Sequence, residues 1–154
     1  MSLLIRDTQA PEKWFDEFPV MNRYTYGLAG ERFYRAIKDS GQIFGTRCYN
    51  CHITYVPARI FCERCFTELT DWIDVGAIGE LYTFTLLYKN LDGSINENPI
   101  PVGFVKIADG GLIHLLGEMN PEEITIGMKL KAKFKPKRDR IGSITDIQFF
   151  IPVK

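Results

Sequence analysis

The chain has 154 residues, of which 45% are hydrophobic and 25% are charged, with 19 basic and 19 acidic side chains. This balance is typical of a soluble globular protein with one domain or two small ones. A formal net charge of zero argues against a protein that binds nucleic acid or membranes through its overall charge. No apolar stretch reaches the roughly 20 residues of a membrane span, and no signal-peptide core is visible. We therefore expect a cytoplasmic protein.

Residues 1–41 are predicted to form an aromatic arm followed by one helix. The arm, residues 1–26, is rich in aromatic side chains, namely Trp14, Phe15, Phe18, Tyr24 and Tyr26. These rings either pack on the protein's own domains or anchor a partner or a second copy, because aromatics are favoured at interfaces. Both interpretations stay open.

A helix is predicted over residues 28–40. Phe33, Ala36 and Ile37 recur at helical spacing and form an apolar stripe. On the polar side, Arg35 lies one turn from both Glu31 and Asp39. Ser40-Gly41 gives the expected C-terminal stop.

All four cysteines lie in one stretch of two C-x-x-C pairs, Cys48/Cys51 and Cys62/Cys65. Each pair can present two sulfurs to a common centre, and four thiolates complete the closed tetrahedral shell of structural zinc. Iron in a rubredoxin-like centre remains an alternative, whereas disulfides would need an oxidising compartment. We assign residues 42–72 to this metal ribbon. A hairpin with Val56-Pro57-Ala58 at its bend is expected between the two pairs.

The sequence pattern of residues 73–154 is typical of strands joined by turns. Five strands are expected, over residues 77–88, 102–108, 112–116, 128–135 and 145–151. Five strands of this kind suit a small barrel such as the OB-fold. The loop from Lys89 to Pro101 is a candidate lid over one face of that barrel. The predicted fold is thus mainly β, with an N-terminal helix.

The order of these segments resembles the DUF35 family. The resemblance rests on "GQIFGTRCYNCHITYVPARIFCERC" and on "GELYTFTLLY", "PIPVGFVKI", "LLGEM" and "IGMKLKAKF", and it covers about residues 25–152. It implies a rubredoxin-like zinc ribbon followed by an OB-fold, with Cys48, Cys51, Cys62 and Cys65 as the ligands. It also implies a role in acyl-CoA metabolism beside a thiolase-like, hydratase or aldolase enzyme. His52 departs from the family, which commonly has glycine there.

Catalysis by this chain alone is not expected. The proposed metal site uses every cysteine and leaves no open coordination position. His114 lies in a strand pattern, and no nucleophile elbow, phosphate loop or dinucleotide motif is present. Nothing in the spacing of Glu80, Glu118 and Asp146 indicates a catalytic pair.

The strongest surface feature is a basic run. Seven of the 19 basic residues fall within positions 129–140: Lys129, Lys131, Lys133, Lys135, Lys137, Arg138 and Arg140. A period of two places the five lysines on one side of a strand. They form either a solvated face that discourages edge pairing or an anion site. Lys129, Lys131, Lys133, Lys135 and Arg138 are candidates for binding coenzyme A phosphates.

We therefore predict a non-catalytic acyl-CoA-binding or adaptor subunit that acts with a thiolase-like or related enzyme, with structural Zn²⁺ and a possible acyl-CoA ligand. The alternative is a module for single-stranded nucleic acid, with Tyr82, Phe84, Tyr88 and Phe104 available for base stacking. The neutral total charge disfavours that alternative.

Overall fold

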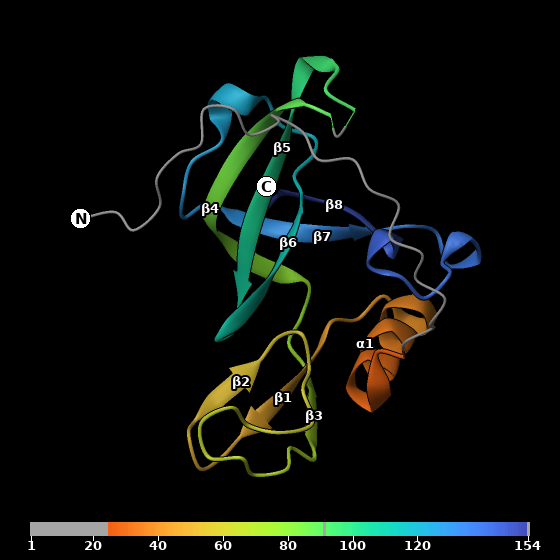
Figure 1. Ribbon diagram of the computed structural model, residues 1–154, viewed down its shortest axis with the longest axis vertical. Helices are drawn as coiled ribbons and strands as arrows, with labels where there is room; N and C mark the ends of the chain where they lie inside the picture. The colour runs from red at the N-terminus through yellow and green to blue at the C-terminus, as the bar shows by residue number, and fades with distance from the viewer. Residues whose placement is uncertain (1–24, 91, 154) are drawn as a thin grey trace, which may run out of the picture.

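The computed structural model describes residues 25–90 and 92–153, so nearly all of the predicted aromatic arm lies outside the described residues. One helix and eight strands follow in chain order (Figure 1): α1 Gly27–Ser40, β1 Phe44–Cys48, β2 Ile53–Tyr55, β3 Asp71–Asp74, β4 Ile78–Lys89, β5 Ile95–Ile107, β6 Gly110–Leu115, β7 Lys129–Phe134 and β8 Ile147–Pro152. Three short 3₁₀ helices, η1 Pro121–Glu123, η2 Lys137–Asp139 and η3 Ile144–Asp146, lie in the connections. Across the described residues, no helix is long and apolar enough to span a membrane.

The predicted helix is confirmed as α1. Its stripe of Phe33, Ala36 and Ile37 is buried and joins the main hydrophobic core. On the solvent side the Arg35 guanidinium pairs with Glu31. The helix ends at Gly41, whose φ of 68° is readily adopted by glycine because it has no Cβ, and whose N–H donates to the Ile37 carbonyl.

A small antiparallel sheet in the order β2-β1-β3 forms the ribbon. β1 pairs with β2 through Thr46–Tyr55 and Cys48–Ile53, so the β1–β2 turn contains the first cysteine pair. The second pair lies in its own turn, closed by a bridge between Phe61 and Glu68. The prediction of a hairpin between the two cysteine pairs is therefore wrong. One pair lies at the β1–β2 turn, and the other lies in the turn closed by the Phe61–Glu68 bridge. β3 is the third strand of the ribbon sheet and pairs with β1.

The second sheet has five antiparallel strands in the order β6-β5-β4-β7-β8 (Figure 1). This matches the five predicted strands and the predicted mainly β fold with an OB-type domain. The sheet is not closed, however. Between its end strands β6 and β8 a single bridge, Leu116 to Phe150, is formed in the described residues. The core of this half centres on Leu81, Val105, Leu130 and Phe150.

The predicted lid is wrong. Residues 95–101 belong to β5, where Ile100 pairs with Leu87 and Pro101 pairs with Leu86 on β4. The alternation of Ile95, Asn96 and Glu97 continues the strand pattern, and the asparagines and prolines of this segment obscured it. β4 and β5 therefore form one long hairpin whose connection is short.

The tip of the β5–β6 hairpin joins the barrel to the ribbon. Gly111 N–H donates to the Val56 carbonyl at 3.0 Å, and Thr54 N–H donates to the Asp109 carboxylate at 2.9 Å. A Cβ at Gly110 would lie 2.3 Å from the Val56 oxygen, so only glycine allows this approach. Because Val56 also packs in the main core, ribbon and barrel are tightly joined.

Candidate metal centre and lysine strand

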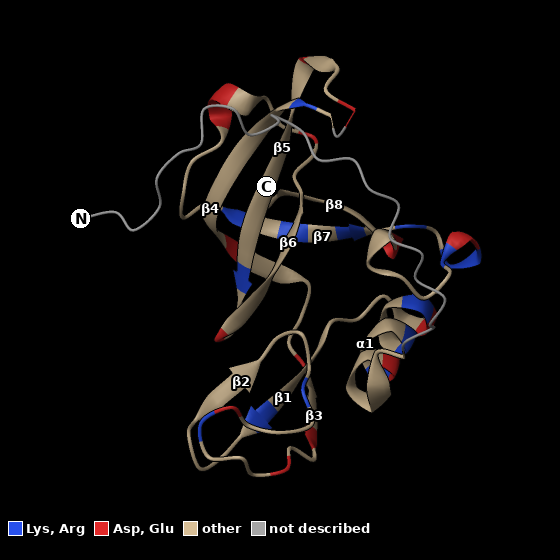
Figure 2. Ribbon diagram, in the orientation of Figure 1, with Lys and Arg blue, Asp and Glu red and all other residues tan. Residues whose placement is uncertain are grey.

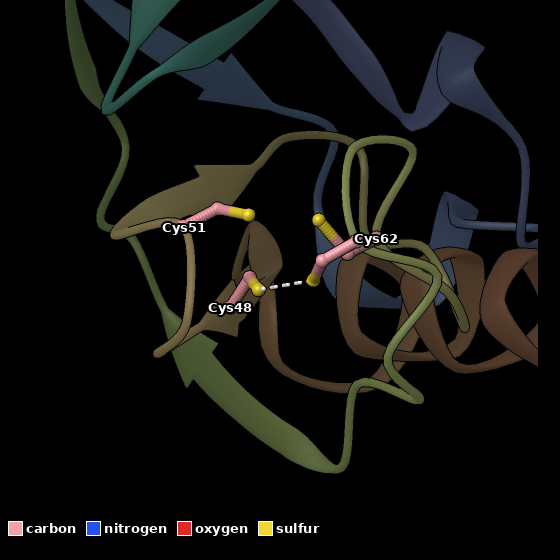
Figure 3. A group of neighbouring side chains, drawn as sticks. Cys48, Cys51 and Cys62 are labelled. Atoms are coloured by element: carbon pink, nitrogen blue, oxygen red, sulfur yellow. Dashed lines mark hydrogen bonds between the residues drawn. The ribbon is translucent and has the colours of Figure 1, made fainter.

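The four cysteine sulfurs converge on one point. The sulfurs of Cys48, Cys51, Cys62 and Cys65 all lie within 4.8 Å of one another, and those of Cys48 and Cys65 are 3.6 Å apart. Figure 3 shows the labelled cysteines facing a common centre between the two turns. A tetrahedral ion with metal–sulfur bonds of about 2.3 Å needs sulfurs roughly 3.8 Å apart. The observed cluster fits that requirement.

Hydrogen bonds from the ribbon act on the sulfurs unequally. The Tyr55 hydroxyl lies 3.2 Å from the Cys62 sulfur. This hydrogen bond is the main reason that the pKa of Cys62 is lowered to about 6, although burial of the thiol acts to raise it. The neighbouring Cys65 sulfur is the main cause that raises the pKa of Cys51 to about 12. Four sulfurs this close cannot all ionise without a cation among them. Four converging thiolates are therefore a suitable ligand set for a divalent ion that favours sulfur ligands, such as zinc.

His52 lies outside the sulfur cluster. Its side chain is exposed, and its φ of 55° is in the left-handed region. Phe66, which follows the second cysteine pair in the same way, has a φ of 56°. The turn after each pair thus needs positive φ, which accounts for glycine in the family at the position of His52.

The lysine strand is shorter than predicted. Lys129, Lys131 and Lys133 lie on β7, but the strand ends at Phe134, so Lys135 and Lys137 lie beyond it. The prediction that all five lysines lie on one side of a single strand is therefore wrong. Lys135 N–H still donates to the Asp146 carbonyl, while Lys137 opens η2. The blue segments along β7 and η2 in Figure 2 mark this basic run.

Several of these cations already have acidic neighbours. Lys129 pairs with Glu80 at 2.9 Å, Lys133 pairs with Glu118, and Arg138 lies 3.6 Å from Asp139. Lys131 is exposed at the centre of β7 and forms no ion pair in the described residues. The local positive charge is therefore smaller than the sequence count indicates.

His114 lies at the seam between β6 and β8. Its Nε2 is 3.2 Å from the Ile144 carbonyl, and its ring meets Phe150 edge to face. Because a carbonyl only accepts, Nε2 carries a proton and donates this hydrogen bond. Nδ1 is buried without a partner in the described residues.

The three carboxylates considered from the sequence do not form a pair. Glu80 and Glu118 bind separate lysines at the surface. Asp146 is buried and accepts hydrogen bonds from the backbone N–H groups of Ile141, Gly142 and Ser143. Sequence reasoning missed this structural role, although Ser143 three residues before Asp146 is a capping signal.

Asp146 is expected to contribute stability that disappears in acid. Burial opposes its charged form, but the three backbone donors and nearby Lys135 prevail and lower the pKa of the carboxyl. Since the folded pKa is below the unfolded value of about 3.9, this stability is full above pH 4 and is lost as pH falls through the folded pKa.

The matching variant is Asp146→Asn, which removes about 2 kcal/mol or more from the free energy of unfolding at pH 7. Urea unfolding at pH 7 and pH 3 measures it, and the gap between variant and wild type should shrink at pH 3. A gap independent of pH would contradict the role of the charge.

The candidate stacking rings divide between surface and core. Tyr82 is exposed and packs edge to face on Phe104 at 6.0 Å, and Tyr88 is exposed near the end of β4. Phe84 packs against the core. The four rings thus do not form one common stacking surface.

Comparison with known proteins agrees with this architecture. Residues 72–135 match the family model described as the C-terminal OB-fold domain of ChsH2. A curated DUF35 domain-containing scaffold protein of Methanothermobacter thermautotrophicus is 21% identical over 110 residues, covering 70% of this chain and 83% of that protein.

Two solved structures share the fold. A DUF35 family protein of unknown function from Sulfolobus solfataricus superposes with a TM-score of 0.58 and 25% identity, over 69% of this chain and 78% of that one. The structure described as the Ltp2-ChsH2(DUF35) aldolase has a TM-score of 0.59 and 20% identity, over 88% and 98% of the two chains. In these matches, and in its four-cysteine ribbon ahead of an OB-fold domain, the chain is similar to proteins of the DUF35 family.

Proposed function

We propose that this chain is a non-catalytic accessory subunit that holds a structural zinc ion and works beside an acyl-CoA-metabolising enzyme. The observation that carries the proposal is the commitment of all four cysteines to one closed four-sulfur cluster. Such a shell leaves no coordination position for a substrate, so the metal acts as a support. The chemistry would then belong to the partner.

The relatives support an assembling role. One is named a scaffold protein, and the other occurs in a structure named as an aldolase together with Ltp2. The placement of the remaining polar groups is consistent with this role, because Glu80 and Glu118 are engaged with lysines and Asp146 is engaged with the backbone. A thiolase-like or aldolase subunit is the partner we propose.

The OB-fold is the part we propose to bind the acyl-CoA. Coenzyme A carries phosphate groups, and clustered lysines attract them. Of the candidates Lys129, Lys131, Lys133, Lys135 and Arg138, Lys131 is the best placed, because it is exposed and its neighbours on β7 are already paired.

Replacing Lys131 with glutamate is expected to weaken coenzyme A binding about tenfold or more, because attraction to phosphate becomes repulsion. Calorimetry with coenzyme A and acetyl-CoA at low salt measures the change. Lys89→Glu, an equal charge reversal at the exposed end of β4, is the matched control. Equal losses in both variants, or no binding by the wild type, would contradict the phosphate site.

The accessory role itself is tested by co-expression with a thiolase-like or aldolase subunit from the same organism. We expect a stable complex on size-exclusion chromatography, with turnover only in its presence. Turnover of acyl-CoA by the isolated chain would contradict the proposal.

A further inference from the structure

Along the outer edge of β6, the backbone forms hydrogen bonds at the two ends but not in the middle, among the described residues. At one end Gly111 N–H donates to Val56 of the ribbon at 3.0 Å, and at the other Gly117 N–H donates to Phe150 of β8 at 2.9 Å. Leu116 N–H points the opposite way and donates to Pro101 on β5. Backbone groups alternate in direction along an antiparallel pair. Ile113 and Leu115 therefore direct their N–H and C=O groups outward, toward no partner in the described part of the chain.

A groove of about 530 Å³ opens beside this gap, between the edges of β6 and β8. Its walls are mostly apolar and include Val102, Ile113, Leu115 and Phe149. Ile113 is 73% exposed and Leu115 is 43% exposed. Lys135 is the one charged side chain among the described residues that line it. The groove thus combines open strand hydrogen bonds, apolar walls and one cation.

The β6 edge also lacks the usual protection against pairing. Exposed edge strands are commonly guarded by lysine, proline or another charge. β6 reads Gly-Gly-Leu-Ile-His-Leu and contains none of these. At the other end of the sheet, β8 finishes at Pro152. An unguarded apolar edge indicates that another segment covers it.

We propose that this edge binds an extended segment of the partner enzyme subunit, which adds as a short strand beside Ile113 and Leu115. The segment would supply backbone groups to these two residues, apolar side chains to the groove and one carboxylate to Lys135. Addition of a strand to a sheet edge is a common mode of peptide recognition. The ribbon already begins this pairing at Gly111, so the segment would extend an existing contact.

The length of the gap limits the segment. Its ends at Gly111 and Gly117 are occupied, so four or five residues of about 3.4 Å each can be accommodated. The inference rests on the proposed accessory function, because that function supplies the partner.

Amide hydrogen exchange on the complex, compared with the free chain, tests the inference residue by residue. In the complex, the amides of Ile113 and Leu115 should exchange at least about tenfold more slowly, because they gain hydrogen-bond acceptors. The Leu112 and His114 amides already face β5 and should change little.

A substitution pair gives a second readout. Ile113→Asp should weaken the complex about tenfold or more, since it places a charge in an apolar contact. Ile126→Asp, at an isoleucine that is 67% exposed, is the matched control and should leave affinity unchanged. Thermal unfolding of both variants checks that they are folded.

A complex that forms while Ile113 and Leu115 exchange as before would overturn the inference and leave the accessory function standing. Failure to form any complex with the co-expressed subunit would overturn both. Protection that grows with the concentration of the chain alone would assign the edge to a second copy instead, and protection by acetyl-CoA alone would assign it to the small molecule.

Discussion

Replacing Cys62 with serine is expected to remove the metal from the ribbon and unfold it. The Cys62 sulfur is fully buried among the other three, and structural zinc supplies on the order of 10 kcal/mol in small ribbon units. The ribbon's own core is small, with Cys48, Tyr55, Cys62 and Leu69 as its buried residues. Metal analysis should give one ion, the proposed zinc, per wild-type chain and nearly none per variant chain.

Circular dichroism and amide exchange can then show which part survives. Exchange should accelerate over β1–β3 while the amides of β4 and β7 keep much of their protection, because Leu81 and Leu130 lie in a separate core. Adding a chelator to the wild type should reproduce the effect. A Cys62→Ser protein with full zinc content and an unchanged thermal midpoint would show that the cluster is not the metal site.

Replacing Gly110 with alanine is expected to separate the ribbon from the barrel. The new Cβ would lie 2.3 Å from the Val56 oxygen and 2.6 Å from its nitrogen, and backbone atoms cannot rotate away as a side chain can. The clash should cost about 3 kcal/mol, with the added loss of the Gly111 to Val56 hydrogen bond. Urea unfolding measures the loss.

Gly76→Ala is the control for this substitution. Gly76 has a φ of 78°, but a Cβ there would meet no atom within 4 Å. It reports the cost of strained backbone alone, about 1 kcal/mol. If Gly110→Ala destabilises no more than Gly76→Ala, the close approach at the junction carries little energy.

Local patterns in the sequence predicted which elements form and where they lie along the chain. The stripe of Phe33, Ala36 and Ile37 located α1, and the two C-x-x-C pairs located the sulfur cluster. The alternation of apolar residues predicted five strands and their OB-type class. These features depend on periodicity and spacing, which a single sequence displays directly.

Features that depend on contacts between distant segments were missed. Residues 95–101 belong to β5 and pair with β4, although their asparagines and prolines are typical of a loop. The acidic partners of Lys129 and Lys133 lie 49 and 15 residues away, so a count of charges could not reveal that they are paired. The open edge at Ile113 and Leu115 depends on hydrogen-bond direction, which residue identity does not record.

Arg140 connects the two ends of the described chain, and this has a consequence for folding during synthesis. Its guanidinium donates to the Lys135 carbonyl at 2.7 Å and reaches the Ile37 carbonyl at the end of α1, 103 positions earlier. The helix also contacts η2 and η3, so its binding site does not exist until residue 146 has been translated. The strands of the ribbon sheet and all four cysteines lie within residues 44–74, so the ribbon can form first. On the ribosome, α1 is therefore synthesised before the ribbon and the OB-fold but packs in its final position after them.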